Sequence, residues 1–258
     1  MIAVDGSKVK ANASKHKAMS YGRMKTEEER LKKEMEELLA KAEMIDAEED
    51  EEYGVDKRGD EIPAELERRE SRLAAIKAAK ERVEKRHNEA QKQEEIPSKV
   101  EIEPPAKMQD NFTDPESRIM KTSNGFEQCY NAQISVAEGS QLIVAAEVTQ
   151  ETNDKKQLIP MVEAVNKECE GYPSEVLADS GYRSEKALLE LEKQKIKGYV
   201  ALGKEQKKPP DINDDLAATK RMADRLAGKK GSRKYRKRKS IVEPVFGWAK
   251  NVLGFRAF

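Results

Sequence analysis

Cysteine and histidine are scarce in this sequence, with two of each among 258 residues. Two cysteines, Cys129 and Cys169, cannot build a disulfide framework, and their small number fits a reducing compartment. The same scarcity of nitrogen and sulfur ligands excludes a convincing structural zinc site. A metal ion in this protein would therefore be held by oxygen, which suits hard cations.

Long apolar runs are missing as well. No stretch approaches the roughly 18 consecutive apolar residues that a transmembrane helix needs, and the mean hydropathy is −0.88. No cationic and then apolar leader opens the sequence. We therefore expect a cytoplasmic protein with no membrane partner. Its length allows one large domain or two small ones with a real core.

The zero net charge hides a segregation along the chain. Residues 26–96 hold 24 acidic and 15 basic residues, whereas residues 229–239 hold eight basic residues and no acidic one. A basic run of this kind fits a solvated loop or tail, and it also fits a local anion-binding surface. Nucleic-acid contact needs support from other residues nearby.

The first hundred residues predict a strand followed by a helical hairpin. Residues 2–11 alternate like a short strand that Asp5-Gly6 breaks or bulges, and residues 12–25 are basic and irregular. Helical periodicity follows on both sides of a turn at 53–62. The first helix, 26–52, begins with a T-x-x-E capping box at Thr26, and the second, 63–93, begins at Pro63.

The remainder of the chain alternates strands with helices. Glu138-Gly139 marks a hairpin turn between two strands. The predicted strands are 130–137, 142–149, 175–178 and 198–202, and the predicted helices are 155–169, 184–195, 213–226 and 240–252. Together with the first strand, this order predicts an α/β fold with a five-stranded mixed sheet and helices on both faces.

These patterns divide the chain into four parts. Residues 1–25 hold the first strand of the core and a basic segment, and residues 26–96 form an inserted, charged helical hairpin. Residues 97–110 contain three prolines and form a linker back to the core. Residues 111–258 supply the remainder of the core.

Two acids stand at predicted strand ends. Asp5 lies in VDGS and Asp179 in LADSG, so each is followed by glycine or by Ser-Gly. Carboxylates at the ends of adjacent strands would point into one crevice. An Asp before Gly is also common in ordinary turns, which is an alternative interpretation without a catalytic role.

A third acid, Glu243, stands in an apolar stretch that also contains Trp248, which we expect in the core. Burying an unpaired carboxylate costs several kcal/mol, so Glu243 needs a partner, a metal ion or water. A capping box from Ser240 to Glu243, with Pro244 in the first turn, is the alternative role. Lys239 and Lys250 share nearly the same helical face as Glu243, which suits a bound polyanion or a simple ion-pair stripe.

Five blocks of sequence together resemble a known family. They are DGSKVKANASKHK at 5–17, DPESRIMK at 114–121, the segment from YNAQISV to QLIPM at 130–161, ADSGYRSE at 178–185 and YRKRKSIVEPVFGWAK at 235–250. In this order they resemble the transposases of bacterial insertion sequences, which carry a DDE catalytic triad on an RNase H-like fold. The predicted strand order agrees with such a core.

The resemblance implies a catalytic triad of Asp5, Asp179 and Glu243 that binds two Mg²⁺ or Mn²⁺ ions. It implies cleavage of DNA at element ends and attack of the freed 3′-hydroxyl on target DNA, by a homo-oligomer. The interval from Glu243 to Lys250 matches the family's last motif, in which Arg236 and Lys239 occupy the places of its Tyr and Arg. We expect four basic residues to contact DNA phosphates: Arg236, Arg238, Lys239 and Lys250.

Relative to that family the sequence lacks a DNA-binding region before the first strand and further chain after the last helix. We expect the catalytic part of a transposase, shortened at both ends, and a metal-dependent strand-transfer enzyme, whether active or an inactive copy, is the first interpretation. A non-enzymatic remnant that uses its helical hairpin for oligomerisation or partner binding is a second. An RNase H-like nuclease that only hydrolyses DNA is a third.

Overall fold

The computed structural model describes residues 1–53, 64–93, 103–203, 212–213 and 215–257. The chain forms two compact units, one made of Met1–Asn12 and Ser117–Phe258 and the other of Ala13–Glu116. The predicted turn at 53–62 falls almost wholly outside the described residues, as does Pro63.

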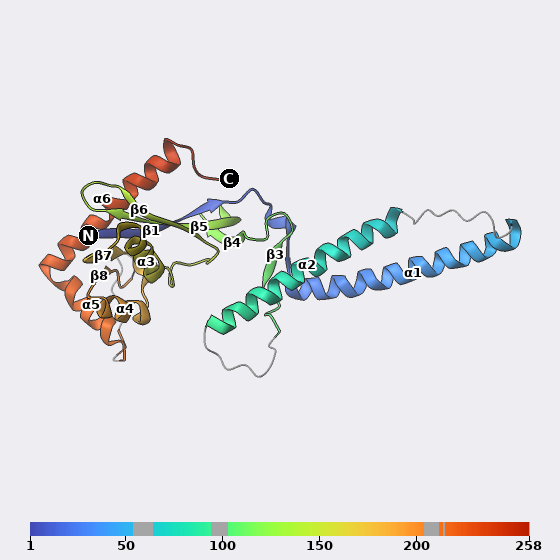
Figure 1. Ribbon diagram of the computed structural model, residues 1–258, viewed down its shortest axis with the longest axis horizontal. Coiled ribbons are helices and arrows are strands. Elements are labelled where there is room, and N and C mark those ends of the chain that lie inside the picture. Colours follow the sequence, from blue (N-terminus) through green and yellow to red (C-terminus); the bar gives the residue numbers. More distant parts are fainter. Residues whose placement is uncertain (54–63, 94–102, 204–211, 214, 258) are drawn as a thin grey trace. The chain divides into compact units, whose positions relative to one another are not determined.

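The first unit is built on a six-stranded mixed sheet (Figure 1). Its path is β4-β5-β1-β7-β8, with β6 paired to β5. The bounds are β1 Ile2–Lys10, β4 Arg118–Thr122, β5 Gly125–Ala137, β6 Ile143–Thr149, β7 Glu175–Ala178 and β8 Lys197–Val200. The five predicted strands are all present, and β4 adds a sixth that the sequence analysis missed. The α/β, RNase H-like fold class is confirmed.

Strand β1 runs without a break through Asp5-Gly6, so the predicted interruption is wrong. All nine residues of β1 pair antiparallel with β5, from Ile2 opposite Ala137 to Lys10 opposite Cys129. Close packing, and not a turn, explains why position 6 is a glycine. A Cβ at Gly6 would lie 2.4 Å from Nε2 of Gln133, so a larger residue would displace that side chain.

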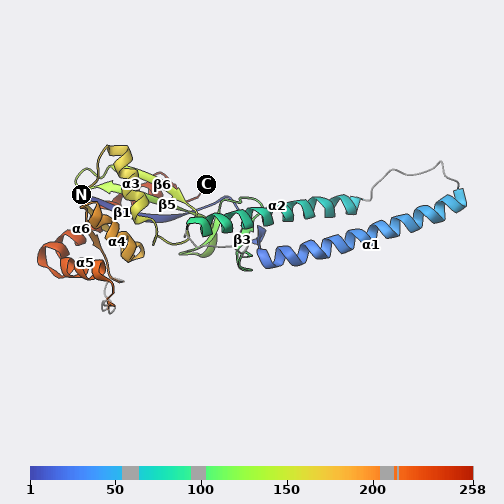
Figure 2. The ribbon, with the colours of Figure 1, turned by 60° about the horizontal axis from the view of Figure 1, so that its bottom comes forward.

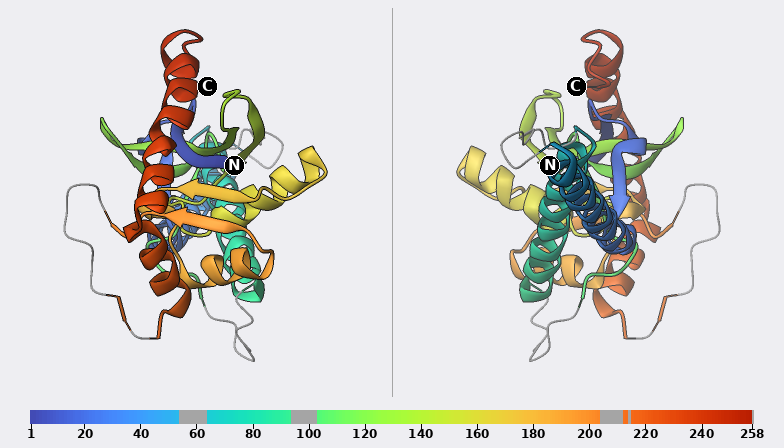
Figure 3. Two further views of the ribbon diagram at one scale, coloured as in Figure 1. Left: turned by 90° about the vertical axis from the view of Figure 1, so that its left-hand side faces the viewer. Right: turned by 90° about the vertical axis from the view of Figure 1, so that its right-hand side faces the viewer.

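Helices cover both faces of this sheet (Figure 3). On one face Val4 and Ala178 pack with α3 (Leu158–Cys169), α4 (Glu185–Lys193) and α5 (Ala217–Ala227). On the other face Ala3 and Leu177 pack against α6 (Lys229–Asn251). Neighbouring residues of a strand point to opposite faces of the sheet. The residues two positions after Ala3 in β1 and after Leu177 in β7 are therefore expected on the α6 face.

Helix α6 starts eleven residues earlier than the predicted helix at 240–252, so the basic run 229–239 forms its first half and not a loop. The capping box at Ser240 is therefore wrong: the Ser240 hydroxyl donates to the carbonyl of Lys237 inside the helix. Pro244 lacks an N–H and leaves the carbonyl of Ser240 without its helical donor. The side chain of Gln141 replaces that donor, with its Nε2 3.2 Å from the Ser240 oxygen.

The second unit is a helical hairpin with a small sheet. Helices α1 (Tyr21–Tyr53) and α2 (Ala64–Gln93) lie side by side near β3 in both Figure 1 and Figure 2. Leu31 of α1 packs with Leu73, Ile76 and Val83 of α2 in a buried cluster. Since α1 begins at Tyr21, the predicted capping box is wrong, and the Thr26 hydroxyl donates to the carbonyl of Gly22.

Residues 12–25 and the described part of the predicted linker, residues 103–110, hold more regular structure than expected. They contain η1 (Lys15–Lys17), β2 (Ala18–Ser20) and β3 (Gln109–Asn111), and β2 pairs antiparallel with β3. The fully buried Asp110 accepts from Arg82 at 2.6 Å and lies 3.0 Å from Arg86. These ion pairs tie α2 to the end of the linker.

None of the described helices combines the length and the apolar character needed to cross a bilayer.

Candidate active site

Asp5 and Asp179 come from neighbouring parallel strands and lie on the α6 side of the sheet. β1 pairs with β7 through Ala3 and Leu177, and both of these residues pack toward α6. Two positions further along, alternation brings Asp5 and Asp179 to that same face. Asp179 caps η2 (Ser180–Tyr182), because its Oδ1 accepts from the Gly181 N–H at 2.7 Å. Both acids therefore lie on one face of the sheet. Asp179 follows the last residue of β7, whereas Asp5 stands within β1 and not at the predicted strand end.

A buried arginine from α6 neutralises Asp5. Nη1 of Arg238 lies 2.9 Å from Oδ2 of Asp5, and the two side chains are 10% and 21% exposed. The other Asp5 oxygen accepts from the N–H of Gly6 at 2.9 Å. Both carboxylate oxygens of Asp5 are thus engaged by protein donors.

The pKa of Asp5 is raised above its ordinary value, chiefly because burial penalises the charged carboxylate. The Arg238 charge lowers that pKa, and the nearby Asp179 charge raises it. The two carboxylates are thus near enough for the charge of one to act on the other. Excess negative charge of this kind is what a bound cation relieves.

Glu243 does not join the two aspartates. It lies on α6 five residues after Arg238, and its side chain is exposed. At about 100° per residue, Glu243 points about 140° away from Arg238 around the helix axis. The described part of the chain holds no group of three His, Cys, Asp or Glu side chains placed to bind a metal ion.

The donor set still suits a divalent cation in its chemistry. Two close carboxylates, one of them with a raised pKa, are the hard oxygen ligands that Mg²⁺ and Mn²⁺ prefer. The arrangement thus fits two of the three predicted ligands, Asp5 and Asp179. Arg238 supplies the positive charge beside Asp5.

The four predicted DNA-contacting residues divide into two groups. Arg238 is buried against Asp5, which removes it from the surface that a phosphate would meet. Arg236, Lys239 and Lys250 instead share one stripe of α6 with Glu243. Arg236 and Lys239 are exposed, and Lys250 is half-buried beside the ring of Phe246.

The expectation of a core position for Trp248 is wrong, since 56% of its surface is exposed. It lies on the last turns of α6, beyond the residues that pack on the sheet, which include Ile241 and Val242.

The sequence analysis missed a polar network behind the two acids. Asp154 accepts from Nδ2 of Asn131 at 2.7 Å and from Nε2 of Gln133 at 2.8 Å, and Tyr182 donates to Gln133. Alternation such as that in YNAQISV is typical of a strand whose polar face meets solvent. The structure buries that face completely at Asn131 and Gln133, which periodicity alone does not reveal.

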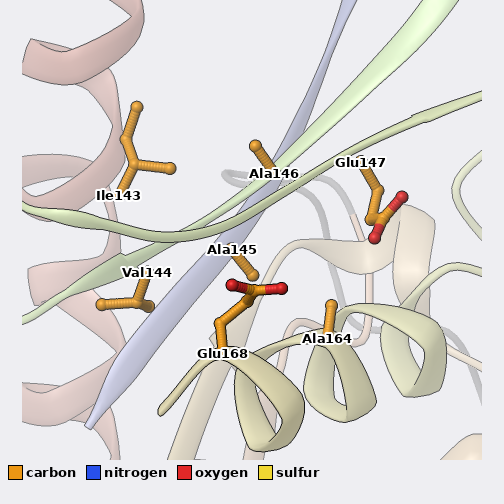
Figure 4. Close-up of a pocket in the computed structure, with 7 residues that line it drawn as sticks. All are labelled: Ile143, Val144, Ala145, Ala146, Glu147, Ala164 and Glu168. Atoms are coloured by element: carbon orange, nitrogen blue, oxygen red, sulfur yellow. The ribbon is translucent and has the colours of Figure 1, made fainter.

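An open pocket of about 300 Å³ lies elsewhere, between β6 and α3 (Figure 4). Glu168 points from α3 toward β6, and Glu147 stands on the strand. Small and aliphatic side chains make up the remainder of its lining. This pocket contains neither of the two paired aspartates and is separate from the candidate site.

Comparison with known proteins identifies the family. A family model described as the transposase DDE domain matches residues 100–258, more than half of the chain. No curated protein and no solved structure matches the sequence. Asp179 and Glu243 lie within the matched residues and Asp5 lies before them. The chain therefore belongs to the transposase DDE domain family.

Proposed function

We propose that this protein is a DNA transposase that cleaves the ends of an insertion element and joins the freed 3′-hydroxyl to target DNA. The observation that supports this proposal is that Asp5 and Asp179 come from the neighbouring parallel strands β1 and β7 of an RNase H-like sheet, and that the Asp179 charge raises the pKa of Asp5. The family match over residues 100–258 supports DNA as the substrate.

In this proposal Asp5 and Asp179 would hold a divalent cation, for which their hard oxygen ligands are suited. When bound, the cation supplies Lewis-acid stabilisation of the charge that develops on a phosphate group during displacement. The protein's own contribution is to fix the two carboxylates on rigid strands. Arg238 balances the charge of Asp5 from α6 and lowers the repulsion between the acids.

We further propose that the exposed stripe of α6 holds the DNA backbone. Arg236, Lys239 and Lys250 would pair with successive phosphates, which positions the strand without reading its bases. Glu243 lies in the middle of this stripe, and its spacing to Lys250 supports it as the third acid. In the structure Arg238, and not Glu243, is the α6 residue that contacts Asp5.

The test is cleavage of supercoiled plasmid with Mg²⁺ or Mn²⁺ by the wild-type chain and by three single variants, Asp5→Asn, Asp179→Asn and Glu243→Gln. We expect nicking by the wild type and a loss of at least about 100-fold in each aspartate variant, because each of these removes a carboxylate from the reacting centre. An equal loss in Glu243→Gln would support Glu243 as the third acid. Glu147→Gln, which changes an acid at the separate β6 pocket, is the matched control and retains activity. Nicking that survives both aspartate substitutions contradicts the assignment.

A second assay separates strand transfer from hydrolysis. A labelled duplex with a free 3′-hydroxyl is offered together with plasmid, and covalent joining of the label to plasmid is measured. Joining supports the transposase, whereas nicking without joining identifies a nuclease that only hydrolyses. Sedimentation with and without duplex DNA tests the expected homo-oligomer. A protein that neither nicks nor joins, yet self-associates, fits the non-enzymatic alternative.

A further inference from the structure

The polar face of β5 is buried where a strand of its pattern would expose it. Asn131 and Gln133 are both 0% exposed. A buried amide without a hydrogen-bond partner costs free energy, so each of these side chains needs a defined partner. The structure supplies those partners from two other segments of the first unit, the loop at residues 151–154 and the turn that ends at Tyr182.

Asp154 is the centre of this network. Its Oδ1 accepts from Asn131 at 2.7 Å, from Gln133 at 2.8 Å and from Nζ of Lys8 at 3.5 Å. Nε2 of Gln133 also donates to Oδ1 of Asn131 at 2.9 Å, and its carbonyl oxygen accepts from the hydroxyl of Tyr182. Both polar atoms of the Gln133 amide, its nitrogen and its oxygen, therefore have hydrogen-bond partners.

The network connects the backbones that carry the two paired aspartates. Tyr182 ends η2, the turn that Asp179 caps. Gln133 stands directly opposite Gly6 in the β1–β5 ladder, next to Asp5. The Asp154 carboxylate lies against both glycines: its oxygens would be 3.1 Å from a Cβ at Gly6 and 3.7 Å from a Cβ at Gly181.

We propose that Asp154 is a positioning residue of the active site, which acts through Gln133 and Tyr182 to fix the spacing between Asp5 and Asp179. This inference rests on the proposed function of those two acids. Asp154 holds the Gln133 amide, the amide holds the Tyr182 hydroxyl, and the hydroxyl fixes the turn that follows Asp179. The separation of two ligating carboxylates sets how well they share a cation, so this network sets metal affinity.

Asp154 is a positioning residue and not a third metal ligand. Its Oδ1 accepts from three donors on the sheet face opposite to the Asp5 side chain, since Gln133 pairs with Gly6, which alternates with Asp5 along β1. In addition, Asp5, Asp154 and Asp179 do not form a metal-binding group in the described residues. The role of Asp154 is therefore indirect.

The experiment compares Asp154→Asn, Tyr182→Phe and the double variant with the wild-type chain. Bound Mn²⁺ is measured by electron paramagnetic resonance, and plasmid nicking is measured over a range of DNA concentrations. Loss of a residue that orients metal ligands costs about 10- to 100-fold in metal affinity or turnover. We expect each single variant to weaken Mn²⁺ binding about tenfold and to lower kcat, with the KM for DNA unchanged within twofold.

Two features separate this role from a general structural one. The double variant is expected to be no weaker in Mn²⁺ binding than the worse single variant, because the two residues act as one unit. Tyr172→Phe is the matched control: it removes a hydroxyl that donates to Glu163 away from the site and leaves Mn²⁺ binding unchanged. Asp154 is 25% exposed, so Asp154→Asn remains a test if Tyr182→Phe fails to fold.

Mn²⁺ affinity within twofold of wild type in both folded single variants would overturn the inference, as would additive losses in the double variant. Failure of the proposed function has a different signature. In that case Asp5→Asn and Asp179→Asn would keep both Mn²⁺ binding and nicking. The wild-type chain, with its two aspartates intact, serves as the common reference for both outcomes.

Discussion

The guanidinium of Arg238 lies against the half-buried carboxylate of Asp5 and supplies its counter-charge. Removing Arg238 would leave the carboxylate without its counter-charge, while Asp179 continues to repel it. Breaking a fully buried pair costs about 3–5 kcal/mol, and we expect about 2–3 kcal/mol for Arg238→Met because Asp5 keeps some solvent contact. Urea denaturation at pH 7 measures this loss in the free energy of unfolding.

The matched control is Arg236→Met, which removes an exposed charge two residues away on the same helix and should change stability by less than about 0.5 kcal/mol. Adding Asp5→Asn to Arg238→Met should recover part of the loss, since the unpaired charge disappears. If Arg238→Met is as stable as Arg236→Met, the ion pair does not form in solution.

The raised pKa of Asp5 predicts how the stability of the protein depends on pH. Burial holds this pKa above its ordinary value of 3.8, so the folded protein binds the proton more tightly than the unfolded chain does. Stability must then fall as the pH rises from about 3.8 through the raised pKa, and level off above it. Asp5→Asn lacks this titration. Urea denaturation of both proteins from pH 3 to 8 should show the wild type losing stability relative to Asp5→Asn only in that window.

The same experiment on Asp179→Asn tests the cause of the shift. Without the neighbouring charge, the pKa of Asp5 should move down toward its ordinary value, and the pH-dependent loss should shrink. A pH profile identical to that of the wild type would mean that the two carboxylates are not coupled.

At the scale of elements, α6 depends on a hydrogen bond from outside the helix. Pro244 withdraws the donor that the Ser240 carbonyl needs, and Gln141 supplies a replacement. We expect Gln141→Ala to lower the free energy of unfolding by about 0.5–1 kcal/mol, the net value of an exposed hydrogen bond. In a Pro244→Ala background the helix provides its own N–H, so the same substitution should cost nearly nothing. Thermal or urea unfolding of the four proteins in this cycle gives the coupling, and equal costs in both backgrounds would refute it.

The same helix shows where sequence patterns succeed and where they fail. The strands β7 and β8 and the helix α4 follow from local periodicity, and each was predicted. The start of α6 was not predicted, because a proline after Ser240 normally marks a first turn and the rescue comes from Gln141, 99 residues away in sequence. Asp154 was missed for a similar reason: it lies between β6 and α3, and its amide partners lie 21 and 23 residues away on β5.

For the whole molecule, the family match and the α6 stripe together make a prediction about DNA binding. Removing one phosphate-binding cation reduces the slope of log affinity against log salt by about 0.9. Changing Arg236, Lys239 and Lys250 together to glutamine should therefore reduce that slope by about 2–3. The triple variant should also bind any duplex sequence more weakly, because cations that pair with phosphates do not read bases. Fluorescence anisotropy of a labelled random-sequence duplex at salt concentrations between about 50 and 300 mM KCl measures both quantities.

The matched control changes three exposed lysines of the second unit to glutamine: Lys33, Lys41 and Lys77. It alters the net charge by the same amount but lies in the unit whose residues 26–96 carry the acidic excess. If the total charge of the protein governs its attraction to DNA, both triple variants should weaken binding alike, because long-range steering depends on total charge. If α6 is the interface, only the α6 variant loses salt dependence. Equal slopes in the two variants would therefore remove α6 as the DNA-binding surface, while the pairing of Asp5 with Asp179 would remain to be judged by cleavage alone.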